Sequence, residues 1–118
     1  MSDQKLDATV LDCLFRTIEG RKGSDPTQSH TAKLFAKGTA KIAQKVGEES
    51  VEAIIEAMRC DNEALVAESS DLLYHLLVLW ADRGVRPSDV WAKLKEREGI
   101  SGIAEKAARR EAAKAAGK

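Results

Sequence analysis

Carboxylates are unusually dense between residues 45 and 56, where the chain reads KVGEESVEAIIE. Four glutamates fall in this stretch: Glu48, Glu49, Glu52 and Glu56. Like charges at i,i+4 on a helix repel by about 0.2–0.5 kcal/mol per pair. Because successive helical residues turn by about 100°, Glu48, Glu49 and Glu52 share one side of the helix. Crowding of this kind is explained if the acids hold a cation.

A second acidic pair, Glu68 and Asp71, stands at i,i+3 directly before the apolar run LLYHLLVLW. The short CDN connection at 60–62 makes the two helical segments antiparallel neighbours, so the two acidic groups can converge. Oxygen ligands suit a hard divalent cation, above all Mg²⁺, whereas a di-iron site would favour Glu-x-x-His units. We therefore predict a magnesium site whose ligands are Glu49, Glu52, Glu68 and Asp71.

Lysines precede the acids at every fourth position, as Lys33, Lys37, Lys41 and Lys45. A spaced lysine row is usually a solvated helix face, and the same holds for any single glutamate of this chain. Together, acids for Mg²⁺ and lysines for phosphate oxygens are typical of a polyphosphate site.

These residues must be positioned by helices, since no segment combines β-branched residues with period-two alternation. Helices are predicted at about 5–21, 27–38, 39–59, 61–83 and from 87 onward, with an Ala-rich segment from 100 that is helical in part. Ser24, Asp25 and Pro26 are expected to cap the second helix, and Gly38 is either a break or a kink. Asp61 or Asn62 is expected to cap the fourth, which ends at Gly84.

The predicted fold class is all-α, a small helical bundle of four to five helices in one domain, 1–118, with its core at about 5–110 and an Ala/Lys-rich tail at 111–118. The segment 72–80 is apolar nearly all round and is expected to be the most buried. The apolar side of the third helix is predicted to be Ile42, Ala43, Val46, Ala53, Ile54, Ala57 and Met58. The helix that contains LLYHLLVLW presents more apolar surface than one small core covers, which predicts a homodimer.

Charge balance and apolar patterning disfavour several classes of protein. Nineteen basic and nineteen acidic side chains cancel, which disfavours a nucleic-acid binder or an anionic-membrane binder. The N-terminal residues lack the pattern of a secretory signal, and the longest apolar run, LLVLWA at 76–81, is too short to cross a bilayer. Cys13 and Cys60 lack metal-type spacing. We expect a soluble cytoplasmic protein.

The acidic pattern Glu48-Glu49-x-x-Glu52 followed by Glu68-x-x-Asp71 resembles the E-E-x-x-E…E-x-x-D motif of the MazG-like all-α nucleotide pyrophosphohydrolases. Within them, the chain resembles the phosphoribosyl-ATP pyrophosphohydrolase family over about 5–110. The matching stretches are LFRTIEGRK at 14–22, TAKLFAKG at 31–38, KIAQKVGEESVE at 41–52 and ESSDLLYHLLVL at 68–79. His30 departs from the pattern, which has a tyrosine there.

The resemblance implies a homodimer with Mg²⁺ in each acidic site. The implied reaction hydrolyses the α–β phosphoanhydride of 1-(5-phosphoribosyl)-ATP to 1-(5-phosphoribosyl)-AMP and pyrophosphate, the second step of histidine biosynthesis. Glu48 and Glu49 are then the candidates for catalysis, with Glu48 as a ligand or as the group that orients the attacking water. Lys37, Lys41, Lys45, Arg16 and Arg21 are candidates for phosphate contact.

Two other functions remain open at this point. A house-cleaning pyrophosphohydrolase of (deoxy)nucleoside triphosphates would share the acidic motif. A non-catalytic helical dimer that serves as an interaction module would bind neither Mg²⁺ nor nucleotide.

Overall fold

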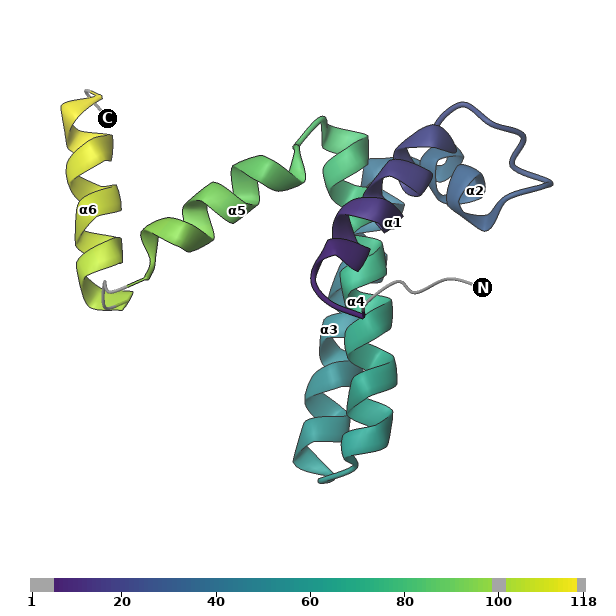
Figure 1. The fold of residues 1–118 in the computed structure, drawn as a ribbon, viewed down its shortest axis with the longest axis horizontal. Coiled ribbons are helices and arrows are strands. Elements are labelled where there is room, and N and C mark those ends of the chain that lie inside the picture. Colours follow the sequence, from purple (N-terminus) through teal and green to yellow (C-terminus); the bar gives the residue numbers. More distant parts are fainter. Residues whose placement is uncertain (1–5, 99–101, 117–118) are drawn as a thin grey trace. The chain divides into compact units, whose positions relative to one another are not determined.

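The structure, a computed structural model, describes residues 6–98 and 102–116, with the side chains of 102–105 left out. Within these ranges the chain forms six helices and no strand, so the all-α prediction is confirmed (Figure 1). The helices are α1 (Thr9–Gly20), α2 (His30–Lys37), α3 (Thr39–Met58), α4 (Asn62–Arg83), α5 (Pro87–Glu96) and α6 (Gly102–Ala115). The count exceeds the four to five expected because the Ala-rich segment forms a helix of its own.

The chain divides into two compact units, residues 1–87 and 88–118. The first unit holds α1 to α4 and all the predicted site residues. The second holds most of α5 and all of α6. A single domain over 1–118 stays a prediction.

The first two helices begin later than predicted. The Asp7 carboxylate accepts hydrogen bonds from the backbone N–H and the hydroxyl of Thr9 (2.9 and 2.6 Å), and the helix starts there; position 5 lies outside the described residues. Asp25 makes the same pair of bonds to Thr27, which closes a turn. The predicted cap at 24–26 is therefore wrong, and Ser29 caps α2 by accepting from the N–H of Ala32 (3.1 Å).

Gly38 separates α2 from α3, since its φ of +94° is open to glycine and strained for other residues. The alternative of a mere kink is thereby excluded. α3 and α4 then run side by side as an antiparallel hairpin (Figure 1). Asp61 caps α4 by accepting from the N–H of Ala64 (3.0 Å), and Gly84 ends it in the left-handed conformation, both as predicted.

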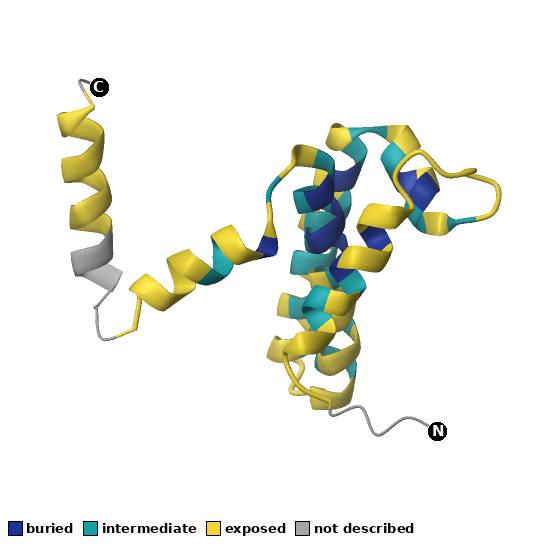
Figure 2. Cartoon of the chain, turned by 45° about the horizontal axis from the view of Figure 1, so that its top comes forward, coloured by how far each residue is buried: buried dark blue, intermediate teal, exposed yellow. Residues whose placement is uncertain are grey.

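The core lies at one end of this hairpin, where α1 and α2 pack on it (Figure 2). Its buried apolar residues are Phe15, Ile18, Ala32, Leu34, Ile42, Leu77, Val78 and Ala81. α4 contributes three of them and the buried His75, so the prediction that 72–80 is the most buried segment is confirmed. α4 also has the length (22 residues) and mean hydropathy (1.3) of a membrane-crossing helix, criteria that the central helix of a soluble bundle equally meets.

The residues predicted for the apolar side of α3 are mostly exposed in the single chain. Ile42 is its one buried residue among those described, whereas Ala43, Ile54, Ala57 and Met58 are exposed. α3 packs mainly on α4 and on the short α2, and its half-buried residues beyond the start include Val46, Glu49, Ser50, Ala53 and Glu56.

The outer side of α3 carries an apolar stripe, which we define as Val51, Ile54, Ile55 and Met58. These residues follow the spacing i, i+3, i+4, i+7 of one helix face, and Ile54 and Met58 are 62% and 79% exposed. On α4, Val66 and Leu73 are exposed as well. Exposed apolar side chains gathered on one face in this way are typical of an interaction surface.

Candidate metal centre

Three carboxylates from the two hairpin helices converge. Oxygens of Glu49 on α3 and of Glu68 and Asp71 on α4 all lie within 4.8 Å of one another. Glu49 and Glu68 are half-buried, and Asp71 is exposed. Among the described residues no other group of three potential ligands is this close. We call Glu49, Glu68 and Asp71 the acid cluster.

The electrostatics of the acid cluster favour a cation. The pKa of Glu68 is raised above its ordinary value of 4.5, first because partial burial removes water from the carboxylate. A hydrogen bond to Glu49 and the charges of Glu49, Asp71 and Glu52 raise it further. A hard divalent cation would relieve this repulsion, and three oxygen donors at this spacing fit one.

Glu52 is the predicted ligand that lies outside the cluster. Its side chain is exposed, although its charge still acts on Glu68. Because Glu52 follows Glu49 by three residues, it sits about one turn closer to the 59–61 connection. Its role as a ligand stays a prediction.

Glu48 lies in a different environment from its neighbour Glu49. The Glu48 carboxylate accepts a hydrogen bond from Gln44 (2.7 Å) and pairs with Lys45 (3.4 Å). These contacts lower the pKa of Glu48, the bond from Gln44 most of all. The two adjacent glutamates, turned by about 100°, therefore face separate surroundings.

The predicted lysine row is not one continuous stripe, because Gly38 divides it. Lys33 and Lys37 are exposed on α2, whereas Lys41 and Lys45 are half-buried on α3, upstream of the acids. The latter two also place positive charge near Glu48.

The two arginines proposed for phosphate contact lie on α1 and at its end. Arg16 is exposed and donates to the Cys13 sulfur (3.6 Å), and Arg21 is the C-cap of α1. Neither has a described contact with the acid cluster.

Comparison with known proteins decides the family. The model of the family described as phosphoribosyl-ATP pyrophosphohydrolase matches residues 11–98. A protein of Azospirillum brasilense named phosphoribosyl-ATP pyrophosphatase is 63% identical over 110 residues, 93% of this chain and 99% of its own. The chain belongs to the phosphoribosyl-ATP pyrophosphohydrolase family.

Two further relatives carry the same name. The one of Gluconobacter oxydans is 58% identical over 100 residues (85% of this chain, 75% of its own), and that of Paramagnetospirillum magneticum is 56% identical over 103 (87% and 94%). Membership of the pyrophosphohydrolase family makes the chain a hydrolase and confirms the resemblance drawn from its motifs. The family match contains the acid cluster and ends before α6.

Sequence reasoning missed a second group of this pyrophosphohydrolase, the His–Tyr cluster of His30, Thr31, Tyr74 and His75. The hydroxyls of Thr31 and Tyr74 are 2.5 Å apart, and the rings of His30 and Tyr74 are within 21° of parallel with centroids 6.4 Å apart. The buried His75 meets the edge of Tyr74 (4.9 Å) and donates from Nδ1 to the backbone carbonyl of Asp71 (2.8 Å). Since Thr31 and Tyr74 are 43 residues apart, no local pattern in the sequence indicates this group.

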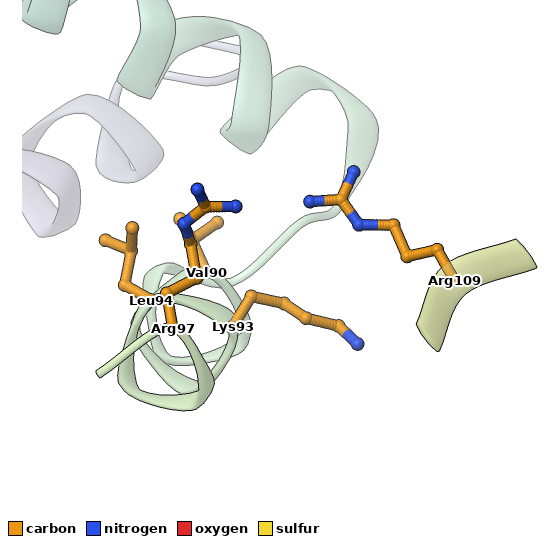
Figure 3. A pocket seen from close by; sticks show the side chains of 5 residues that line it. All are labelled: Val90, Lys93, Leu94, Arg97 and Arg109. Carbon is orange, nitrogen blue, oxygen red and sulfur yellow. The ribbon is translucent and has the colours of Figure 1, made fainter. Parts of the chain in front are cut away.

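In the described part of the chain, the two larger hollows both lie outside the acid cluster. A groove of about 560 Å³ between α1 and α4 is mostly apolar, lined by Val10, Leu11, Leu14, Leu65, Val66, Ser69, Ser70, Leu73 and Tyr74. In the second unit, a hollow of about 470 Å³ is lined by Val90, Lys93, Leu94 and Arg97 of α5 and by Arg109 of α6 (Figure 3). The latter lining includes no carboxylate, so it lacks the oxygen ligands of a magnesium site.

Proposed function

We propose that the chain hydrolyses the α–β phosphoanhydride of phosphoribosyl-ATP to phosphoribosyl-AMP and pyrophosphate in a Mg²⁺-dependent reaction, the second step of histidine biosynthesis. The observation that carries the proposal is the convergence of Glu49, Glu68 and Asp71 within a match to this family. The names of the relatives support the substrate.

The acid cluster would hold Mg²⁺, with Glu52 as a further ligand. When bound, the ion supplies electrostatic stabilisation to phosphate oxygens. Lys41 and Lys45 add positive charge beside the acids, where negative charge develops on the leaving pyrophosphate. Lys37, Arg16 and Arg21 are the more distant candidates for phosphate contact.

Glu48 is the candidate for orienting the attacking water. Its pKa is lowered by Gln44 and Lys45, and as an ionised carboxylate it accepts a hydrogen bond rather than donating one. Its contact with Lys45 places this acceptor beside the cations proposed for phosphate. Glu49, by contrast, is proposed to act in the acid cluster.

We propose further that the protein works as a soluble cytoplasmic homodimer. The apolar stripe on α3 and the exposed Val66 and Leu73 on α4 are a surface that a second copy would cover. A second copy is the favoured occupant because such faces are self-complementary across a two-fold axis, and the single chain buries few apolar side chains of its own.

The deciding experiment measures pyrophosphate release from phosphoribosyl-ATP with and without Mg²⁺, for the wild type and the matched variants Glu49→Gln and Glu48→Gln. We expect Glu49→Gln to lose about a hundredfold or more in kcat/KM together with the rise in melting temperature that Mg²⁺ confers. Glu48→Gln should lose kcat but keep the Mg²⁺-dependent rise. Full Mg²⁺-dependent turnover by Glu49→Gln would refute its place in the site.

Substrate choice is tested with a panel of ribo- and deoxyribonucleoside triphosphates. Faster turnover of these than of phosphoribosyl-ATP would favour the house-cleaning function instead.

A further inference from the structure

We propose that His30 and Tyr74 form an aromatic platform on which the purine base of the nucleotide stacks, beside the acid cluster that takes the phosphates. The inference rests on the proposed function, because it supposes a nucleotide substrate. It assigns a role to the His–Tyr cluster, which the metal centre does not use.

The two rings have the geometry of a stacking surface. They are within 21° of parallel, and their centroids are 6.4 Å apart, near the loose end of the range for aromatic pairs. His30 is exposed at the start of α2, so its ring is open to a ligand. A third planar ring can stack on this pair without displacing a buried side chain.

Tyr74 is held in place from two sides. Its hydroxyl is bonded to that of Thr31, and its ring is met edge-on by the buried His75. Such support lowers the conformational entropy lost when a ligand stacks on the ring.

The platform is tied to the acid cluster through α4. Tyr74 follows Asp71 by three residues, which is about 4.5 Å along the helix axis. His75 reinforces the link, since its Nδ1–H donates to the Asp71 carbonyl. In a nucleotide one ribose separates the base from its phosphates, so a ligand held by the acids would extend its base along the adjacent turn.

Stacking recognises the flat face of a base rather than its edge. The platform therefore accounts for affinity toward nucleotides as a class. It assigns no hydrogen bond that would select adenine over guanine.

The test compares two probes, ATP and tripolyphosphate, which carry the same triphosphate with and without a base. Binding of each, with Mg²⁺, is measured by calorimetry for the wild type, His30→Leu and His30→Phe. We expect His30→Leu to weaken ATP binding by about tenfold and to leave tripolyphosphate unchanged. His30→Phe keeps a flat ring and should stay within about twofold of the wild type for both.

Three outcomes would overturn the platform. They are an unchanged affinity of His30→Leu for ATP, an equal loss for both probes, and a His30→Phe variant as weak as His30→Leu. Since position 30 is exposed, circular dichroism is expected to show the same helix content in all three proteins. Failure of the wild type to hydrolyse phosphoribosyl-ATP, with the contrast between probes intact, would instead refute the proposed function alone.

Discussion

The two ends of the α3–α4 hairpin are built from the same kind of helix and serve different purposes. At the covered end, α1 and α2 bury Ile42, Leu77 and Val78 in an apolar core (Figure 2). Toward the 59–61 connection the facing sides carry acids and the outer side of α3 carries the apolar stripe. The apolar core at the covered end therefore stabilises the fold. The rest of the hairpin, toward the 59–61 connection, is the open end, and it holds carboxylates that repel one another.

Glu68 and Glu48, two glutamates of the hairpin, differ in the direction in which their pKa values are shifted. Burial and neighbouring acids raise the pKa of Glu68, while Gln44 and Lys45 lower that of Glu48. Both are helical glutamates, so the difference in pKa comes from their burial and their neighbouring groups. Glu68 belongs to a cluster that needs a cation, whereas Glu48 already has its partners.

The largest difference in stability between the two ends is expected when two leucines one turn apart on α4 are each replaced by alanine. Leu77 is 1% exposed and Leu73 is 43% exposed. Leu77→Ala should lower the free energy of unfolding by about 2–5 kcal/mol, since it leaves a cavity in the core. Leu73→Ala should lower it by less than about 1 kcal/mol at a concentration where the protein is monomeric. Urea unfolding measures both, and equal losses would contradict the division into two ends.

A charge introduced into the apolar stripe tests whether this surface forms the proposed dimer interface. Ile54→Asp should raise the dimer dissociation constant by about a hundredfold or more, because it would bury an unpaired carboxylate between subunits. Sedimentation velocity over a range of concentrations measures this. Glu63→Gln, an exposed change on α4, is the control. A wild type that sediments as a monomer at every concentration would refute the proposed interface.

The elements were predictable because their signals are local. Asp61 and Gly84 bound α4 as expected, since capping depends on residues within one turn. The start of α2 was not, because Asp25 and Ser29 offer competing side-chain acceptors and only one of them caps. Periodicity placed Ile54 and Met58 on one face but could not say that no helix of the same chain covers that face.

The site was predictable to the extent that it follows helix geometry. Spacing predicted that Glu49, Glu52, Glu68 and Asp71 converge across an antiparallel hairpin. The structure brings Glu49, Glu68 and Asp71 together and leaves Glu52 outside the cluster. It could not separate Glu48 from Glu49, whose surroundings depend on side-chain partners. The approach of His30 to Tyr74 depends on how α2 packs on α4, and no local pattern encodes that.

Removing one charge of the acid cluster is expected to stabilise the metal-free protein while it destroys the metal site. The folded-state pKa of Glu68 is raised, so the folded state holds this proton more tightly than the unfolded chain does. Protonation of Glu68 therefore stabilises the folded state fully at pH values below its ordinary pKa of 4.5. This stabilisation is lost as the pH rises through the raised pKa of the folded state. Glu68→Gln avoids that loss and should melt a few degrees higher than the wild type at pH 7 without metal.

The comparison is made by thermal melting in chelator at several pH values. The advantage of Glu68→Gln should shrink as the pH is lowered toward 4.5, and Mg²⁺ should stabilise the wild type alone. If Glu68→Gln were less stable than the wild type at pH 7 in chelator, repulsion between these carboxylates would not be destabilising the metal-free protein.

The smallest effect is expected at the tip of the open end, where Cys60 has a φ of +60°. This left-handed conformation disfavours residues with a Cβ, by roughly 1–2 kcal/mol, and glycine adopts it freely. Part of the gain from Cys60→Gly is offset because glycine is also freer in the unfolded chain, so we expect a net stabilisation of up to about 1 kcal/mol. Cys60→Val, which is β-branched, should destabilise instead. The tip is far from the core, so neither change should alter the slope of the unfolding free energy against urea concentration. A changed slope would mean that the two ends of the hairpin do not unfold together.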